Sequence, residues 1–132
     1  MVLEGLSKEI WEKKYKADSD TDIEATWRRV ASFVAGAEDN YQGKKKVGNS
    51  QYWTQRFFDL LSGFKFIPGG RITEGAGTKN PYLNNCFVLD IDDDLEDIYE
   101  TIKRVAVISK KNGGVGFNVS KIRPAGAKPS VS

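Results

Sequence analysis

Cys86 is the side chain best suited to chemistry in this sequence, because it is the single cysteine among 132 residues and there is no histidine. The lack of histidine excludes a Ser-His-Asp triad and a Cys-His nucleophile pair. One cysteine cannot form an intrachain disulfide, a CxxC redox pair or a structural zinc site. Two interpretations of Cys86 remain open: a buried thiol that packs as a small hydrophobe, or a redox thiol whose partner lies outside this chain.

Glycine-rich segments lie before and after this cysteine, at Pro68–Arg71, Gly75–Thr78 and Asn112–Gly116. Glycine lets the backbone approach a ligand closely, and successive free N–H groups can bind an anion. The alternative is that the first two segments are turns and the third is a helix C-cap followed by a turn. The third segment also lacks the GxxxxGK[ST] spacing of a phosphate-binding P-loop.

Charged residues form two short clusters. Asp90 and Asp92–Asp94 could hold a cation, but the spacing of an EF-hand loop is absent, and such a run more often begins a helix. Lys44–Lys46 is typical of a solvated loop, with a phosphate-binding patch as the alternative. Because the formal net charge is only +2, direct nucleic-acid binding is not expected.

Three amphipathic helices are predicted around these segments. Thr21 and Glu24 have the spacing of a capping box at the start of the first helix, and Gly63 is expected to end the second. Their apolar faces, at helical spacing, are Ile23, Trp27, Val30 and Val34 in the first helix, Trp53, Phe57, Leu60, Leu61 and Phe64 in the second (from about Ser50), and Leu95, Ile98, Ile102, Val105 and Ser109 in the third.

Two short strands flank the third helix, at Cys86–Ile91 and Val115–Val119. Strand, helix, glycine-rich turn and strand predict a β-α-β unit with parallel strands. Two parallel strands alone leave both faces and both edges uncovered. We therefore expect this chain to be the front portion of a larger protein, or one piece of a split one.

No targeting signal or membrane span is expected, because the first sixteen residues contain no apolar core and no stretch approaches about 18 apolar residues. A single unpaired cysteine fits a reducing compartment. These features favour a cytoplasmic protein without a membrane partner.

Several ordered motifs, covering nearly the whole chain, carry a resemblance to a known family. These motifs are Ile10–Tyr15, Thr26–Val30, Phe66–Ile72, Gly75–Thr78, Leu83–Val88 and Gly113–Pro124. With them, the sequence resembles the N-terminal part of the ribonucleotide reductase catalytic subunit, and looks most like the adenosylcobalamin-dependent class.

The resemblance implies an α+β fold. An N-terminal helical layer, residues 1–65, would be followed in residues 66–132 by the first β-α-β elements of a ten-stranded α/β barrel. It also implies removal of the 2′-hydroxyl of a ribonucleotide by radical chemistry. In that chemistry a thiyl radical generated by adenosylcobalamin abstracts the 3′-hydrogen, and a pair of cysteines delivers two reducing equivalents. Cys86 matches the first cysteine of that pair.

The resemblance also implies binding residues. Asn85, Cys86 and Gly114 match positions that contact the substrate. Gly70 matches a substrate-phosphate position often filled by Ser or Thr, where glycine allows only a backbone contact. Effector residues implied in the same way are Asp93 for the ribose, its neighbours Asp94 and Leu95, and Arg123 for phosphate. Asp94 stands where serine commonly follows that aspartate.

The implied partners are a ribonucleotide substrate, a dNTP or ATP effector, a thioredoxin-like reductant, the remaining part of the reductase, and a second copy in a homodimer. Because the thiyl-forming cysteine and the second reducing cysteine would lie elsewhere, we expect no reductase activity from this chain alone. The alternative is a non-catalytic helical interaction module or nucleotide-binding module that happens to carry glycine-rich loops.

Overall fold

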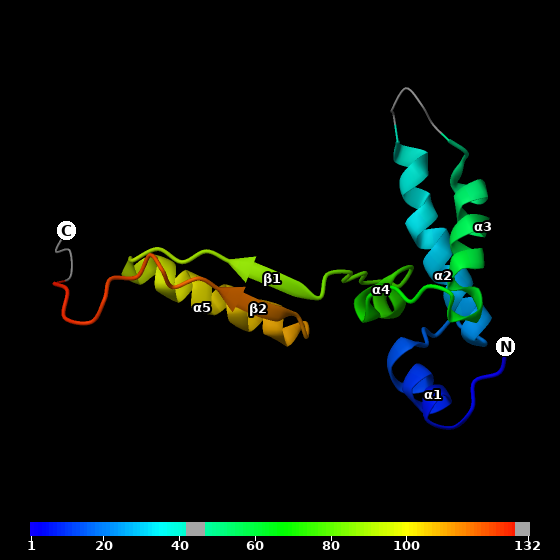
Figure 1. The fold of residues 1–132 in the computed structure, drawn as a ribbon, viewed down its shortest axis with the longest axis horizontal. Coiled ribbons are helices and arrows are strands. Elements are labelled where there is room, and N and C mark those ends of the chain that lie inside the picture. Colours follow the sequence, from blue (N-terminus) through cyan, green and yellow to red (C-terminus); the bar gives the residue numbers. More distant parts are fainter. Residues whose placement is uncertain (42–46, 129–132) are drawn as a thin grey trace. The chain divides into compact units, whose positions relative to one another are not determined.

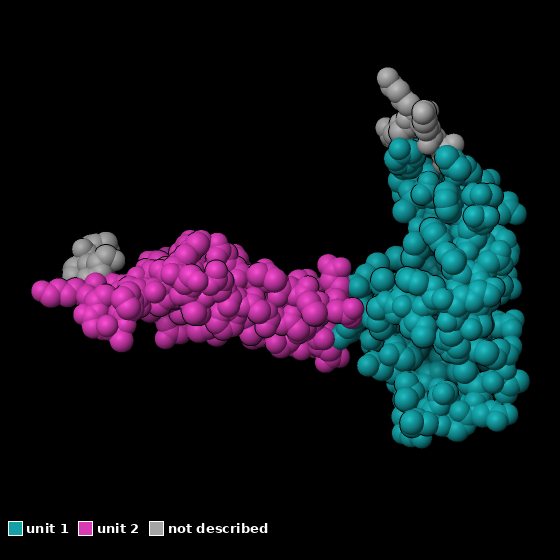
Figure 2. All heavy atoms as spheres, in the orientation of Figure 1, with its two compact units in different colours: residues 1–83 teal, residues 84–132 magenta. Residues whose placement is uncertain are grey.

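The computed structural model describes residues 1–41 and 47–128. They form two compact units, Met1–Leu83 and Asn84–Ser132, coloured separately in Figure 2, and each is described here by itself. Residues 66–83, which were expected to begin the second part of the chain, group with unit 1. The lysine cluster Lys44–Lys46 lies outside the described residues.

Unit 1 is helical (Figure 1). Helices α2 and α3 pack against each other, and Gly63, at φ +68°, lies two residues beyond the end of α3 as predicted. The sequence patterns missed α1, the π-helix η1 and α4. The elements are α1 (Gly5–Ile10), η1 (Trp11–Tyr15), α2 (Ile23–Ala35), the 3-10 helix η2 (Gly36–Asn40), α3 (Ser50–Leu61), the 3-10 helix η3 (Ser62–Phe64) and α4 (Gly70–Gly75).

The core of unit 1 is built on the predicted face of α2. Ile23, Trp27 and Val30 are buried as expected, whereas Val34 is 39% exposed. The indole ring of Trp27 packs edge to face against the Phe64 ring, with centroids 5.2 Å apart. The buried cluster consists of Trp11, Ile23, Trp27, Val30, Ala31, Leu61 and Ala76.

The predicted capping box at the start of α2 is wrong by one residue. Asp22, not Thr21, is the N-cap, and its carboxylate accepts the Ala25 N–H at 2.8 Å. The Thr21 hydroxyl instead donates to the Asp22 carboxylate at 3.3 Å. Aspartate and threonine are both good N-caps, so residue type could not decide between these neighbours.

A buried ion pair between Asp20 and Arg29 organises the same unit. Their side chains are 1% and 8% exposed, and the closest nitrogen–oxygen distance is 2.9 Å. The guanidinium also donates to the carbonyl oxygens of Tyr15 at 3.2 Å, Thr73 at 3.1 Å, and Ala76. One side chain of α2 therefore fixes η1, the middle of α4 and the residue that directly follows α4.

The carboxylate of Asp20 is equally well satisfied. It accepts hydrogen bonds from the Ala17 N–H at 3.0 Å and from the Thr26 hydroxyl at 2.8 Å. That hydroxyl in turn accepts the indole N–H of Trp11 at 2.9 Å. Burial raises the pKa of Asp20, but the hydrogen bonds from Arg29, Ala17 and Thr26 outweigh it and hold the pKa below its usual value.

The glycines of Gly75–Thr78 serve this packing. A Cβ on Gly75 would lie 2.9 Å from the Tyr82 carbonyl oxygen, and one on Gly77, at φ +73°, would lie 2.8 Å from Arg29 Cγ. The Thr78 hydroxyl donates to the Gly75 carbonyl oxygen at 2.8 Å. These contacts support the turn interpretation of this segment over an anion-binding one.

Unit 2 is the predicted β-α-β unit. Strands β1 (Cys86–Leu89) and β2 (Gly114–Phe117) are parallel, with Cys86 opposite Gly114 and Leu89 opposite Phe117, and α5 (Leu95–Lys110) connects them. Asn112, at φ +57°, follows α5 in the left-handed conformation, which confirms the helix C-cap and turn at this end. The structure therefore contains helices and a two-stranded parallel sheet.

The predicted apolar face of α5 is partly wrong. Ile98 and Val105 are half-buried, but Leu95 and Ile102 are 69% and 55% exposed. The inward face is shifted around the helix and includes Thr101, which is 2% exposed and donates its hydroxyl to the Asp90 carbonyl oxygen at 3.3 Å. Because Thr101 is polar, the hydrophobic pattern of the sequence did not reveal that the buried face is shifted.

Within the described ranges, no helix is long and apolar enough to cross a membrane.

We predict that Asp20→Asn lowers the free energy of unfolding by about 3 kcal/mol, because it leaves the Arg29 guanidinium buried without its counter-charge. Urea denaturation at neutral pH measures this loss. Asp18→Asn, at an exposed position in the same segment, is the control and should be nearly neutral.

The loss of unfolding free energy caused by Asp20→Asn should also depend on pH. The folded-state pKa of Asp20 lies below its ordinary value of 3.8, so the ion pair stabilises the fold fully above that value. This contribution is lost as the pH falls through the depressed pKa. An equal loss in both variants, or a gap that grows below pH 3.8, would contradict the assignment.

Candidate functional site

Cys86 is the first residue of β1, and its thiol is exposed. The interpretation of this residue as a buried hydrophobe is therefore wrong. The parallel register places Gly114 opposite it, and the Gly114 N–H donates to the Asn85 carbonyl oxygen at 2.8 Å. The structure thus brings together three of the predicted substrate residues, Asn85, Cys86 and Gly114.

Gly113, just before β2, and Gly114, its first residue, have different reasons to be glycine. A Cβ on Gly113 would lie 2.6 Å from Ile108 Cγ2 and 3.0 Å from the Phe87 ring, so packing requires glycine there. A Cβ on Gly114 would meet the Asn85 oxygen at 3.6 Å and the Cys86 sulfur at 3.7 Å, which are ordinary contacts. Packing does not require glycine at position 114. Glycine at this position leaves the space beside the Cys86 thiol open.

Gly70, the fourth predicted substrate residue, belongs to unit 1, where it is the first residue of α4. The N-cap is Gly69, whose carbonyl oxygen accepts the Ile72 N–H at 2.8 Å. A Cβ on Gly70 would lie 3.4 Å from the Tyr15 hydroxyl. The backbone of Gly70 is thus close to a phenol.

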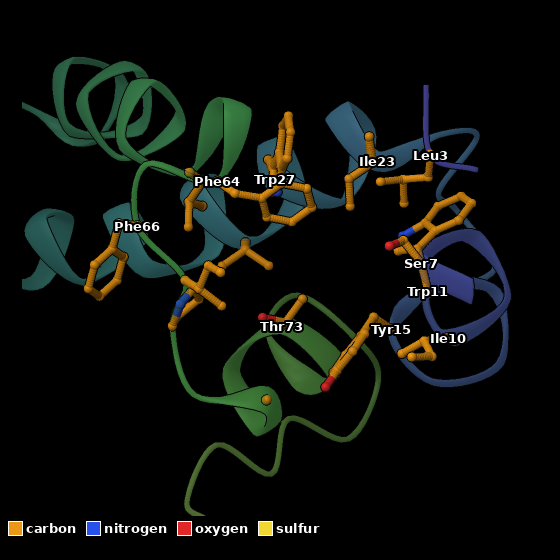
Figure 3. Close-up of a pocket in the computed structure, with 15 residues that line it drawn as sticks. Leu3, Ser7, Ile10, Trp11, Tyr15, Ile23, Trp27, Phe64, Phe66 and Thr73 are labelled. Carbon is orange, nitrogen blue, oxygen red and sulfur yellow. The ribbon is translucent and has the colours of Figure 1, made fainter. Parts of the chain in front are cut away.

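An apolar cavity of about 340 Å³ lies within unit 1 (Figure 3). Gly70 is one of the residues that line it. Tyr15 and Thr73 contribute polar atoms to a wall that is otherwise mainly aromatic and aliphatic. The sequence patterns did not predict this cavity, because its wall combines residues from α1, η1, α2, α3, η3 and α4. Its aromatic residues are Trp11, Tyr15, Trp27, Phe64 and Phe66.

The predicted effector residues gather around the N-terminus of α5 in unit 2. Asp93 and Arg123 form an ion pair of 2.7 Å between Oδ2 and Nε, with side chains 28% and 30% exposed. Asp94 is the N-cap of α5, and its Oδ1 accepts the N–H groups of Glu96 at 2.9 Å and Asp97 at 3.1 Å. Leu95 is exposed. The carboxylate of Asp94 is therefore engaged with the helix, as the N-cap interpretation of the acidic run expected.

Lys121 is the charged residue of this region that the sequence analysis missed. Its ammonium group contacts the carboxylates of both Asp90 and Asp92, the latter at 2.8 Å. These hydrogen bonds raise the pKa of Lys121, and the Lys121 bond lowers the pKa of Asp90. Within the described residues, no group of three or more His, Cys, Asp or Glu could hold a metal ion.

Two family models match the chain in succession. Residues 2–81 match the model described as "Ribonucleotide reductase, all-alpha domain". Residues 84–130 match "Ribonucleotide reductase, barrel domain". The junction between the matches coincides with the junction of the two units at Leu83 and Asn84.

Curated relatives carry related names. The vitamin B12-dependent ribonucleoside-diphosphate reductase of Mycobacterium tuberculosis is 39% identical over 98 residues, which is 74% of this chain and 14% of the relative. That of Thermoplasma acidophilum is 35% identical over 105 residues, 80% of this chain and 12% of the relative. The ribonucleoside-diphosphate reductase subunit alpha of Chlamydia muridarum is 33% identical over 101 residues, 76% of this chain and 9% of the relative. The matches therefore span only a small part of these relatives.

Gly113, which directly precedes β2, and Gly114, its first residue, give a paired test of the site geometry. Gly113→Ala should lower the free energy of unfolding by about 2 kcal/mol through overpacking against Ile108 and Phe87. Gly114→Ala should change it by less than about 0.5 kcal/mol, because its contacts are ordinary. Chemical denaturation followed by circular dichroism compares them. Equal destabilisation would show that the space beside Cys86 is not open.

Proposed function

Because this chain belongs to the ribonucleotide reductase family, we propose that it acts as the N-terminal part of a large subunit that converts ribonucleotides to deoxyribonucleotides. The exposed thiol of Cys86, paired with Gly114 across a parallel ladder, is the observation that carries this proposal. The matched family models support it over a non-catalytic interaction or nucleotide-binding module. In the complete enzyme, β1, α5 and β2 would be the first elements of a ten-stranded α/β barrel.

Cys86 would supply one half of the reducing pair. In the overall step the 2′-hydroxyl leaves as water, a C–H bond replaces the C–O bond, and two thiols are oxidised to a disulfide. The chain contains one cysteine, so the second thiol must come from the remaining part of the reductase. For the same reason we expect no turnover from this chain alone. A thioredoxin-like dithiol would then reduce the disulfide.

The residues beside the thiol would orient the substrate. Gly114 leaves the approach to the Cys86 sulfur open, so a ribose could lie against the backbone without meeting a Cβ. Asn85, held through its carbonyl oxygen by the Gly114 N–H, would contact the same substrate. Gly70, which belongs to unit 1, would offer only its backbone to a substrate phosphate, as the first residue of α4.

The N-terminus of α5 would hold a dNTP or ATP effector. Asp93 and Arg123 are paired with each other in the structure, so a bound effector would take the place of this pair. Ribose hydroxyls would then donate to Asp93, and a phosphate would accept from the Arg123 guanidinium. Asp94 would keep α5 capped, and the exposed Leu95 would border the nucleotide.

Adenosylcobalamin is the proposed cofactor of the complete enzyme, by similarity to the vitamin B12-dependent relatives. It would generate the radical that starts the reduction. We expect its contacts to lie in the remaining part of the reductase.

A homodimer in the cytoplasm is the proposed assembly. The α5 helix exposes a row of apolar side chains at helical spacing, namely Leu95, Tyr99 and Ile102. Such a row is the kind of surface that a partner helix covers. The same helix carries the proposed effector residues at its N-terminus, so an effector would lie beside the dimer contact.

We predict that Cys86→Ser in the complete reductase abolishes multiple turnover with a dithiol reductant, because serine cannot form the disulfide. Product formation from a ribonucleotide, followed by chromatography, measures this. Substrate affinity is the control and should change by less than about twofold, since serine is nearly the same size as cysteine and keeps a polar atom at the same position. Turnover at the rate of the unmodified enzyme would remove Cys86 from the reducing pair.

We also predict that Arg123→Lys weakens effector binding about tenfold, because lysine keeps the charge but loses the planar fork that holds a phosphate. Equilibrium dialysis of the complete reductase with ATP and each dNTP measures the affinities. Arg104→Lys, an exposed arginine of α5 paired with Glu100 at 3.5 Å, is the matched control. If both variants bind effectors as tightly as the unmodified enzyme, Arg123 does not hold the phosphate.

A further inference from the structure

Lys121 joins two segments beyond the end of the strand ladder. The paired residues of β1 and β2 end at Leu89 and Phe117. The Lys121 ammonium group contacts the carboxylates of Asp90 and Asp92, 31 and 29 residues earlier in the chain. It therefore holds the segment after β2 against the segment between β1 and α5, where the backbone ladder no longer does so.

These two segments also carry the proposed effector residues. Asp93 directly follows Asp92, and Arg123 lies two residues after Lys121. The Lys121 contacts and the Asp93–Arg123 pair of 2.7 Å are thus two adjacent connections between the same two segments. Asp92 is further fixed by its N–H, which donates to the Asp97 carboxylate in the first turn of α5 at 2.7 Å.

In the effector site proposed above, a phosphate on Arg123 and a ribose on Asp93 would replace the ion pair between these two residues. The two segments would then lose that connection and keep the one made by Lys121. The contacts of Lys121 do not involve either ligand-binding group. They can therefore keep Asp93 and Arg123 at the separation that the ligand spans.

We propose that Lys121 is a positioning residue of the effector site, which holds the Asp93 and Arg123 segments together while a nucleoside triphosphate occupies the place of their ion pair. This inference rests on the effector site proposed above. It adds a residue that contacts no ligand and acts through two carboxylates on the opposite segment.

The test compares Lys121→Met, Lys121→Arg and Lys103→Met in the complete reductase. Lys103 is the matched control, because it is an exposed lysine of the same unit paired with Glu100 at 3.1 Å. Equilibrium dialysis with ATP and each dNTP gives the affinities, and turnover without effector gives the basal rate. Lys121→Met should weaken binding about fivefold and leave the basal rate unchanged, whereas Lys121→Arg should restore the affinity.

Three outcomes would overturn the inference. The first is that Lys121→Met binds effectors as tightly as Lys103→Met does. The second is that Lys121→Met lowers the basal rate and the effector affinity in parallel, which would indicate a purely structural role. The third is that Lys121→Arg is folded but does not restore the affinity. If the unmodified enzyme binds none of the nucleotides, the proposed effector site itself is wrong, and this inference falls with it.

Discussion

The architecture of unit 1 depends on a buried guanidinium. Arg29 meets the Asp20 carboxylate and three backbone carbonyl oxygens, from η1 and from the α4 region. A buried carboxylate and its counter-ion are costly to remove from water unless every lone pair and proton finds a partner. Here the planar fork of arginine supplies those partners in several directions. The turn at Gly75–Thr78 follows from it, because Gly77 has space for no more than a hydrogen beside Arg29.

Local patterns predicted the elements whose causes lie close together in the chain. The apolar spacing of α2, the helix end near Gly63 and the β-α-β order of unit 2 are set by neighbours within a few turns. The Asp20–Arg29 network was not predictable in this way, since its carbonyl partners lie up to 47 residues from Arg29. The shifted face of α5 was missed for another reason: Thr101 is polar but buried, and its hydroxyl is satisfied by the Asp90 carbonyl oxygen.

The candidate site also contains features that the sequence predicted and features that depend on residues distant in the chain. Cys86 stood out by residue type, and its position opposite Gly114 followed from the expected parallel pairing. Its exposure did not follow, because a lone cysteine on an apolar strand is as compatible with burial. Resemblance to a family suggested Asp93 and Arg123, and the structure brings these two side chains together. The sequence did not indicate Lys121, because its contacts are with Asp90 and Asp92, which are distant in the sequence and close in space.

The pairing of Cys86 with Gly114 also constrains how such a chain can change length. Side chains alternate between the two faces of a strand, so a shift of one residue turns every side chain of that strand to the other face. An insertion or deletion in the crossover between β1 and β2 must therefore be absorbed in its turns, without moving this pair. The segment from Asp90 to Gly113 must therefore always span the same distance between the two strands. Its exposed side chains are freer to vary than its number of residues.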